Sequence, residues 1–123
     1  MRLSGGADDS MGAVMLYNNN QWNLVCSEAI DKVAAQVICR QLNYQDGRAI
    51  PKSAFGDIEI ENTPVPLKYN SISCSGSETS VFDCRVTYTG GRCPSNTYAS
   101  VYCSDGVIDE NGKFLIIQEI VFT

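Results

Sequence analysis

Six cysteines constrain the fold of this chain more strongly than any other feature of its sequence. The chain contains no histidine and no C-x-x-C pair, and its cysteines are Cys26, Cys39, Cys74, Cys84, Cys93 and Cys103. Structural zinc sites usually combine closely spaced cysteine pairs, commonly with histidine, and neither feature is present. The cysteines therefore predict three disulfides and an oxidising, extracellular environment. Their spacing alone leaves the pairing open.

The composition is that of one globular domain. With 123 residues, of which 44% are hydrophobic and 19% charged, the chain can bury one core and is too hydrophobic to be disordered. Its net charge is −5, and its nine Lys and Arg residues form no basic run, which argues against nucleic acid as a partner. No segment reaches the roughly 18 unbroken apolar residues of a membrane span, so we expect no direct membrane insertion.

The first half of the sequence predicts a β-hairpin followed by a helix. "GAVMLY" (12–17) and "QWNLVC" (21–26) are typical of strands, and the three asparagines between them are typical of a turn. Asp31 is a candidate N-cap, and a narrow polar stripe follows it, formed by Lys32, Gln36, Arg40 and Asn43. The rest of the helical surface is apolar. Such a helix is buried on several sides, as it is when a curved sheet wraps it.

The second half is less regular. Residues 45–70 contain Pro51, Pro64 and Pro66 and show little periodicity apart from "DIEIE" (57–61). "NSISC" (70–74) and "YASVYC" (98–103) predict short strands, and the Gly- and Ser-rich residues 74–84 predict a tight loop.

The residues offer little for catalysis. Without histidine, neither a Cys–His nor a Ser–His pair can form. In "DIEIE", Asp57, Glu59 and Glu61 share one face of an extended strand. This pattern is compatible with a divalent-cation site and, less well, with a glycosidase pair, but a solvated strand edge protected by its charges is the favoured interpretation. We expect no catalytic residue and no enzyme.

Six short motifs occur in a fixed order along the chain. They are R-L-x-G-G (2–6), G-x-V-x-V with Leu at its last position (12–16), Q-W-x-x-V-C (21–26), V-x-C-R-Q-L (37–42), S-C-x-G-x-E followed by a cysteine (73–84) and V-x-C-S (101–104). Together they resemble the scavenger receptor cysteine-rich domain, over residues 2–104.

The resemblance implies an α+β fold in which a curved antiparallel β-sheet cradles one α-helix. We expect the domain to span residues 1–105, and residues 106–123 to form a C-terminal β-strand tail or the start of a following domain. Many members of the family carry eight cysteines, and the two extra ones fall at Ser10 and Tyr44 of this chain, as expected for a disulfide gained or lost as a unit. The six-cysteine form implies the pairs Cys26–Cys93, Cys39–Cys103 and Cys74–Cys84.

The resemblance also indicates where cations bind in the family. The family ligands are an Asp-Asp pair after one cysteine and a Glu before the last one, and the matching residues here are Ser27, Glu28 and Thr97. A second acidic pair corresponds to Asn70 and Ser71. Glu28 is the one carboxylate that remains, so the resemblance implies calcium binding that is weak at best and no required cofactor.

The resemblance also implies a second kind of ligand, because members of the family bind polyanions through clustered arginines. Arg85 and Arg92 flank residues 86–91 and have Tyr88 between them, so the three are a candidate ligand-binding patch on a disulfide-locked scaffold. Two arginines are few, and ordinary surface charge is the favoured interpretation.

The tail after Ser104 carries the last candidate. "ENG" (110–112) is typical of a turn, and the residues after it predict a strand of about ten residues. Such a strand needs a partner, either the domain's own sheet or another chain. The candidate assembly residues are Phe114, Leu115, Ile116, Ile117, Ile120, Val121 and Phe122.

These features predict a non-enzymatic extracellular module of a receptor or secreted mosaic protein, which recognises a protein or glycan ligand. The alternative is a structural module of an extracellular matrix or filament, assembled through contacts with neighbouring protomers or domains.

Overall fold

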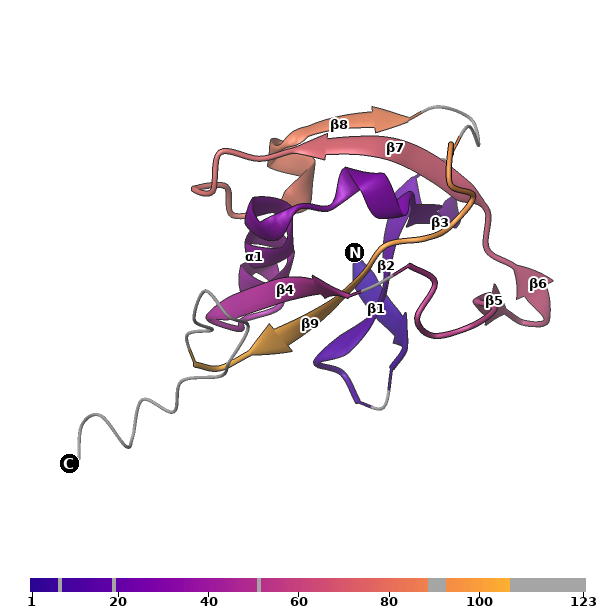
Figure 1. The fold of residues 1–123 in the computed structure, drawn as a ribbon, viewed down its shortest axis with the longest axis horizontal. Helices are drawn as coiled ribbons and strands as arrows, with labels where there is room; N and C mark the ends of the chain where they lie inside the picture. The colour runs from indigo at the N-terminus through magenta and orange to yellow at the C-terminus, as the bar shows by residue number, and fades with distance from the viewer. Residues whose placement is uncertain (7, 19, 51, 89–92, 107–123) are drawn as a thin grey trace.

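The structure is a computed structural model that describes residues 1–6, 8–18, 20–50, 52–88 and 93–106 (Figure 1). Within these ranges the elements in chain order are β1 (Arg2–Gly5), β2 (Met11–Asn18), β3 (Gln21–Val25), η1 (Ser27–Ala29), α1 (Lys32–Gln41), β4 (Asp46–Ile50), β5 (Glu59–Ile60), β6 (Thr63–Pro64), β7 (Leu67–Ser73), η2 (Val81–Asp83), β8 (Arg85–Tyr88) and β9 (Ser100–Ser104).

Seven strands form one curled sheet with α1 on its concave side (Figure 1). Six of them follow the order β4-β9-β2-β3-β7-β8, and β1 pairs with β2. The α+β class and the curved sheet around one helix are confirmed. The sheet is mixed, however, because β3 and β7 run parallel while the other pairs are antiparallel. A parallel pair needs a long crossover, and the connection between β3 and β7 contains α1 and β4.

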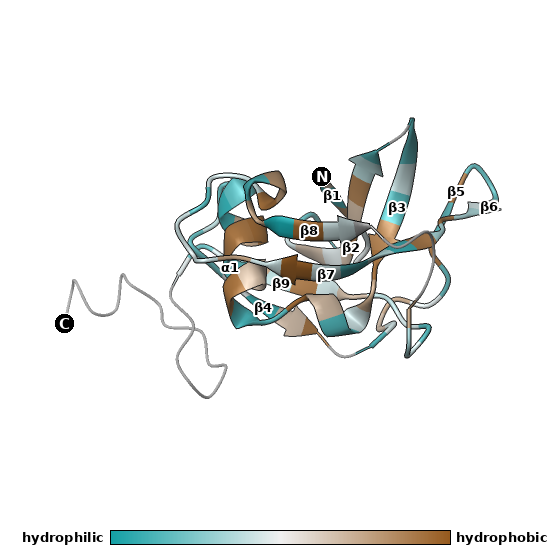
Figure 2. Cartoon of the chain, turned by 90° about the horizontal axis from the view of Figure 1, so that it is seen from above, coloured by the Kyte–Doolittle hydropathy of each residue, from teal (hydrophilic) through white to brown (hydrophobic). Residues whose placement is uncertain are grey.

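The predicted hairpin is confirmed as β2 and β3. Tyr17 pairs with Trp22, and Asn18 pairs with Gln21. Asn20 closes the turn with a φ of 64°, a left-handed conformation that asparagine tolerates better than most residues. The hairpin and the small β5–β6 sheet lie toward the end of the domain opposite α1, as Figures 1 and 2 show.

Both ends of α1 follow from local chemistry. The Asp31 carboxylate accepts a hydrogen bond from the Ala34 backbone N–H at 2.8 Å, which confirms the predicted N-cap. At the other end Asn43 adopts a φ of 72°. The N–H groups of Asn43 and Tyr44 then donate to the carbonyls of Arg40 and Cys39, both at 2.9 Å. This is the Schellman pattern, with asparagine in place of the usual glycine.

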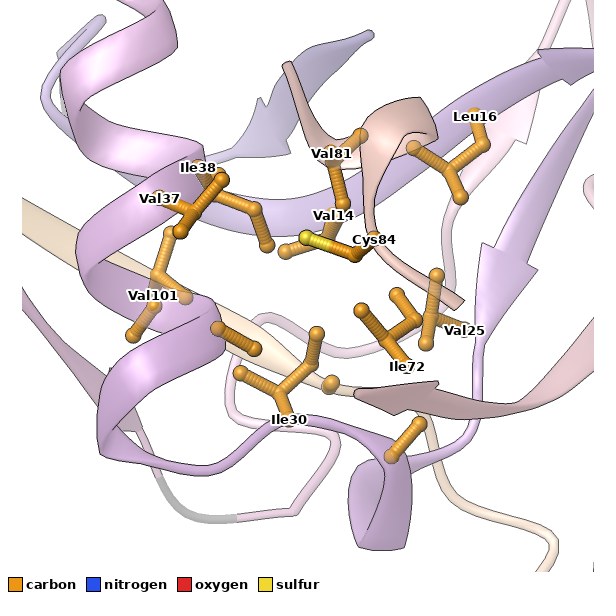
Figure 3. Packing of buried hydrophobic residues seen from close by; sticks show 14 of the residues in the cluster. Val14, Leu16, Val25, Ile30, Val37, Ile38, Ile72, Val81, Cys84 and Val101 are labelled. Carbon is orange, nitrogen blue, oxygen red and sulfur yellow. The ribbon is translucent and has the colours of Figure 1, made fainter. Parts of the chain in front are cut away.

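The main core lies between α1 and the concave face of the sheet (Figure 3). The helix contributes Val37 and Ile38, and the sheet contributes Val14, Leu16, Val25, Ile72 and Val101. All of these side chains are buried. Val81, from η2, closes the same cluster.

The convex face is covered as well, by the segment from Lys52 to Pro66. Its side chains Phe55, Ile58, Ile60 and Val65 pack against Met15 and Leu24 of the hairpin. The Tyr98 hydroxyl holds this segment in place, because it accepts from the Phe55 N–H at 2.8 Å and donates to the Gly56 carbonyl at 2.6 Å. Burial raises the pKa of Tyr98, and nearby Asp57 adds to the effect.

Strand β4 corrects the expectation that residues 45–70 lack regular structure apart from "DIEIE". It pairs with β9 at the edge of the sheet and lies against α1. Asp-Gly-Arg-Ala is a poor local signal for a strand, so the pairing with β9 decides its conformation. Strands β1 and β8 were likewise not predicted as strands.

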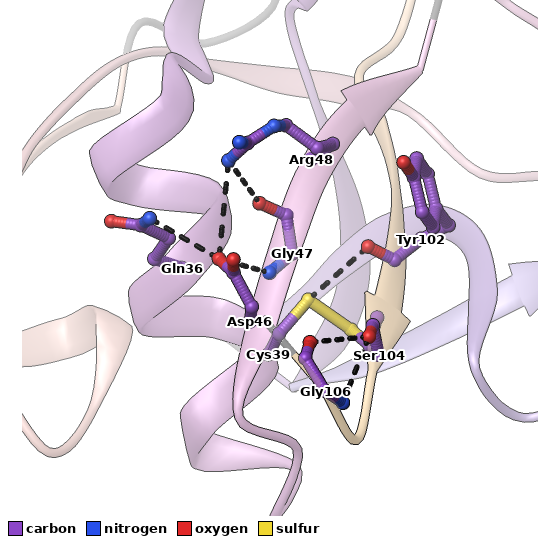
Figure 4. Close-up of polar contacts among 9 residues, drawn as sticks. Gln36, Cys39, Asp46, Gly47, Arg48, Tyr102, Ser104 and Gly106 are labelled. Atoms are coloured by element: carbon purple, nitrogen blue, oxygen red, sulfur yellow. Dashed lines mark hydrogen bonds and ion pairs between the residues drawn. A yellow bond between two sulfur atoms is a disulfide. The ribbon is translucent and has the colours of Figure 1, made fainter. Parts of the chain in front are cut away.

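The start of β4 is in contact with the helix (Figure 4). The buried Asp46 carboxylate accepts from Gln36 Nε2 at 3.2 Å and from the Gly47 N–H at 2.8 Å, and it lies 3.9 Å from Arg48 Nη1. Beside it, a Cβ on Gly47 would lie 2.2 Å from Cys39 Sγ and 3.0 Å from the Ala35 carbonyl oxygen. Only glycine therefore lets β4 pass this close to the helix.

We predict that Gly47→Ala destabilises the oxidised protein by about 1–3 kcal/mol, because the added methyl group must displace the disulfide sulfur or the helix backbone. Urea unfolding measures the loss, and alkylation followed by mass spectrometry shows whether the bond at Cys39 still forms. Ala49→Ser is the matched control, since Ala49 is exposed on the same strand. Equal stability of Gly47→Ala and the unmodified chain would contradict the prediction.

Candidate functional site

All six cysteines form disulfides, which confirms the prediction of three bonds. The pairs are Cys26–Cys93, Cys39–Cys103 and Cys74–Cys84, with sequence separations of 67, 64 and 10 residues. No cysteine is free. The chain therefore has no thiolate to act as a nucleophile or a metal ligand.

The residues at the family's cation position are close together in space. The Ser27 N–H donates to the Thr97 carbonyl at 2.9 Å, next to the Cys26–Cys93 bond. The hydroxyl oxygens of Ser27 and Thr97 are 2.7 Å apart, and Ser95 Oγ lies 3.2 Å from the first and 2.6 Å from the second. These three residues, called the hydroxyl cluster below, hydrogen-bond to one another.

The hydroxyl cluster does not fit a calcium ion. Calcium takes six to eight oxygen ligands and prefers carboxylates, whereas Glu28 is the one acidic side chain here and is exposed. Hydrogen bonding from Ser95 lowers the pKa of Glu28. In the described parts of the chain, two groups of acidic and sulfur ligands converge, Cys26 with Glu28 and Cys93, and Cys74 with Glu78 and Cys84. Their sulfurs are all in disulfides, so each group offers one carboxylate.

The three carboxylates of "DIEIE" are not brought together. Strand β5 covers only Glu59–Ile60, and Glu61 and Asn62 turn the chain with φ values of 52° and 63°. Asp57, Glu59 and Glu61 are all exposed. They belong to no converging group among the described residues.

We predict that calcium leaves the stability of this protein unchanged, because Glu28 alone cannot replace the hydration shell of the ion. Thermal unfolding should give the same Tm in millimolar calcium and in EDTA, both for the unmodified chain and for Glu28→Gln. A calcium-dependent rise of several degrees that Glu28→Gln abolishes would restore a cation site at the hydroxyl cluster.

A carboxylate to which the sequence assigned no role organises the loop from Cys74 to Cys84. Glu78 accepts from the N–H groups of Ser75 and Gly76, both at 2.9 Å. Hydrogen bonds from these backbone groups lower the pKa of Glu78 to about 2. The available signal was the glutamate two residues after Gly76 in the motif S-C-x-G-x-E.

Two residues at the end of α1 hold the same loop. Arg40 donates to the Gly76 carbonyl, and Gln41 Oε1 accepts from the Val81 N–H at 2.8 Å. The motifs at 37–42 and 73–84 are therefore in contact. Gln36 and Arg40, members of the predicted polar stripe, bind Asp46 and Gly76, and the bond from Val81 to Gln41 holds η2 against the helix.

We predict that Glu78→Gln flattens the pH dependence of stability in acid. Because the pKa of Glu78 is about 2 in the folded protein, below its ordinary value of 4.5, its stabilising contribution is present above pH 4.5 and is lost as the pH falls toward 2. Urea unfolding across this range should show a smaller loss for Glu78→Gln than for the unmodified chain. Glu59→Gln, at an exposed carboxylate, is the control, and a slope for Glu78→Gln equal to that of the unmodified chain would contradict the assignment.

The candidate patch of Arg85, Tyr88 and Arg92 is only partly within the described residues. Arg85 is exposed and begins β8, the edge strand, and Tyr88 ends it. Arg92 and the candidate assembly strand at 114–122 lie outside the described residues, so both proposals stay predictions.

Among the hollows on the described surface, three are lined by residues discussed above. The first, of about 570 Å³, is lined by Ser10 and Tyr44 together with Asp8, Asp9 and Asp105. It therefore places side by side the two positions at which the resemblance puts an extra disulfide. The second, of about 550 Å³, and the third, of about 310 Å³, lie along the segment 53–66 and share Pro64 and Val65. No helix in the described part of the chain is both long and apolar enough to cross a membrane.

Known proteins resemble this chain over most of its length. The sequence model of the scavenger receptor cysteine-rich domain matches residues 4–104. Lysyl oxidase homolog 2 of Bos taurus is 34% identical over 104 residues, 85% of this chain and 13% of that protein. Macrophage scavenger receptor types I and II of Mus musculus is 34% identical over 106 residues, and galectin-3-binding protein of Bos taurus is 32% identical over 129 residues. These matches cover 85% and 99% of this chain, and 22% of each relative. The chain thus spans only 13–22% of the length of these relatives.

Solved structures share the fold. The dimeric form of the corresponding domain of mouse MARCO matches with a TM-score of 0.62 and 32% identity, covering 85% of this chain and 94% of that one. The third such domain of murine neurotrypsin matches with a TM-score of 0.67 and 30% identity, covering 86% and 95%.

Proposed function

Because the chain belongs to the scavenger receptor cysteine-rich domain family, we propose that it is a non-enzymatic, extracellular ligand-recognition module of a receptor or secreted protein. The observation that carries the proposal is a scaffold whose sheet is covered on both faces and locked by three disulfides. Such a scaffold holds surface segments in defined positions, which is what recognition by loops requires. The segments are β8, the segment 52–66 and the tip of the β2–β3 hairpin.

The cysteines support the extracellular location, since bonds of this kind form and persist in oxidising compartments. The non-enzymatic assignment rests on the absence of histidine from the sequence and on the pairing of every cysteine. Lysyl oxidase homolog 2 has the name of an enzyme, but this chain matches 13% of it.

A second candidate function is structural, with chains assembled through contacts between copies. The solved dimeric form of the MARCO domain favours it, because a domain of the same fold pairs with a second copy there. In this chain we propose residues 114–122 as the segment that makes such contacts, since an apolar strand needs a partner.

Two measurements on the oxidised 123-residue chain separate these functions. For recognition, we expect saturable binding to purified cell-surface or matrix proteins in surface plasmon resonance, unchanged by EDTA and lost after reduction of the disulfides. Sedimentation of the same sample should show a monomer. Self-association that disappears on deletion of residues 107–123, with no binding to any foreign protein, would instead establish the structural function.

A further inference from the structure

The third hollow is a groove between two hairpins. The β2–β3 hairpin supplies Tyr17 and Trp22, and the segment after β5 supplies Glu61, Pro64 and Pro66. This groove and the second hollow adjoin at Pro64 and Val65, which line both, and the two together are called the hairpin groove below. The third hollow carries Tyr17 and Trp22 together with Glu61, and the second hollow, beyond Pro64, carries Asp57 and Glu59.

The aromatic pair is held in place before any ligand arrives. Tyr17 and Trp22 are cross-strand partners, and their rings contact edge to face with centroids 5.2 Å apart. The Arg2 guanidinium lies 5.2 Å from the centroid of Trp22, in position for a cation–π contact. Trp22 also packs on the convex-face cluster. Tyr17 is 51% exposed all the same, and only Phe82 is another large exposed hydrophobic residue among the described ones.

The charged side chains that line the hairpin groove are acidic. Among the described residues that line it, the charged ones are Asp57, Glu59 and Glu61, and none is a lysine or an arginine. Arg2, the nearby cation named above, lies over Trp22. A ligand that complements this surface therefore has an apolar part for the aromatic side chains and a positive charge for the acidic ones.

We propose that the hairpin groove binds a proline-rich peptide segment that continues into lysine or arginine. A polyproline II segment is already extended, so it loses little conformational entropy on binding, and its rings stack on aromatic side chains. Its carbonyls form no hydrogen bonds within the segment, and tyrosine and tryptophan each carry a donor that can satisfy them. The basic residues then reach Glu61 and, farther along, Asp57 and Glu59. This inference rests on the proposed recognition function and names the chemical class of its partner.

Trp22 makes the proposal directly testable, because it is the one tryptophan in the chain. The oxidised 123-residue protein is titrated with an acetylated hexaproline peptide ending in two arginines. We expect a saturable change in tryptophan fluorescence, confirmed by calorimetry. A peptide ending in two glutamates should bind about tenfold more weakly at low salt, and high salt should narrow this difference. A Gly-Ser peptide ending in two arginines should not saturate the signal.

Matched variants locate the binding. Tyr17→Ala should weaken binding of the arginine peptide by at least about tenfold, as expected for an aromatic anchor, and Glu61→Gln should reduce the preference for arginine over glutamate. Phe82→Ala is the control, because Phe82 is 48% exposed and does not line the hairpin groove. Calorimetry is the deciding measurement for Tyr17→Ala, because this change also alters the surroundings of Trp22 and therefore its fluorescence. The Tm of the variant shows whether it is folded.

Four outcomes overturn the proposal, three of them in the peptide titrations. These three are absence of peptide binding, binding that Tyr17→Ala leaves unchanged, and equal binding of the arginine and glutamate peptides at low salt. Binding of a neutral oligosaccharide that Tyr17→Ala abolishes would assign the hairpin groove to glycans and also overturn it. If Tyr17→Ala still binds the protein ligands found by surface plasmon resonance, the proposed function stands and only the assignment of the hairpin groove falls.

Discussion

The Cys39–Cys103 bond joins the buried side of α1 to strand β9, and much of the fold depends on that junction. Strand β4 passes directly beside the bond and can do so only because residue 47 is glycine. The buried Asp46 beside it is stabilised by Gln36 from the helix and by Arg48 from its own strand. In a chain-entropy estimate, closing a loop of this length stabilises the fold by about 4 kcal/mol, which is a large share of the net stability of a small domain.

The polar contacts that hold α1 and the surface proposed for recognition lie at different ends of the molecule. Around α1, the helix end is capped by Asn43, and Arg40 and Gln41 hold the loop that Glu78 organises. These polar groups form hydrogen bonds within the domain. At the opposite end, the segment held by Tyr98 covers the sheet and borders the hairpin groove, where aromatic and acidic side chains face solvent.

The hydroxyl cluster occupies the position at which the resemblance places the family's cation ligands. Ser27, Ser95 and Thr97 satisfy one another where a cation would require carboxylates, so the Cys26–Cys93 region is organised by neutral hydrogen bonds. Three exposed acidic side chains, Asp57, Glu59 and Glu61, instead line the hairpin groove. A cationic partner that contacts the protein directly is the simplest match for that distribution of charge.

The sequence by itself determined the features that depend on local patterns: the β2–β3 hairpin, the N-cap at Asp31, the formation of disulfides and, through six motifs, the family and its single helix. It also indicated Ser27, Glu28 and Thr97 as neighbours, but only through the resemblance. Only the tertiary structure decided that Asp46–Ile50 is a strand and that β3 and β7 pair in parallel. It also decided that Glu78 caps its own loop and that Arg40 donates to Gly76. Finally, it placed Tyr17 and Pro64 in the lining of one groove. The physical reason is that most of these contacts join residues some forty or more positions apart in the sequence, and the others depend on the conformation of a loop. Hydrophobic periodicity and capping signals, in contrast, report only on residues that are close together in the sequence.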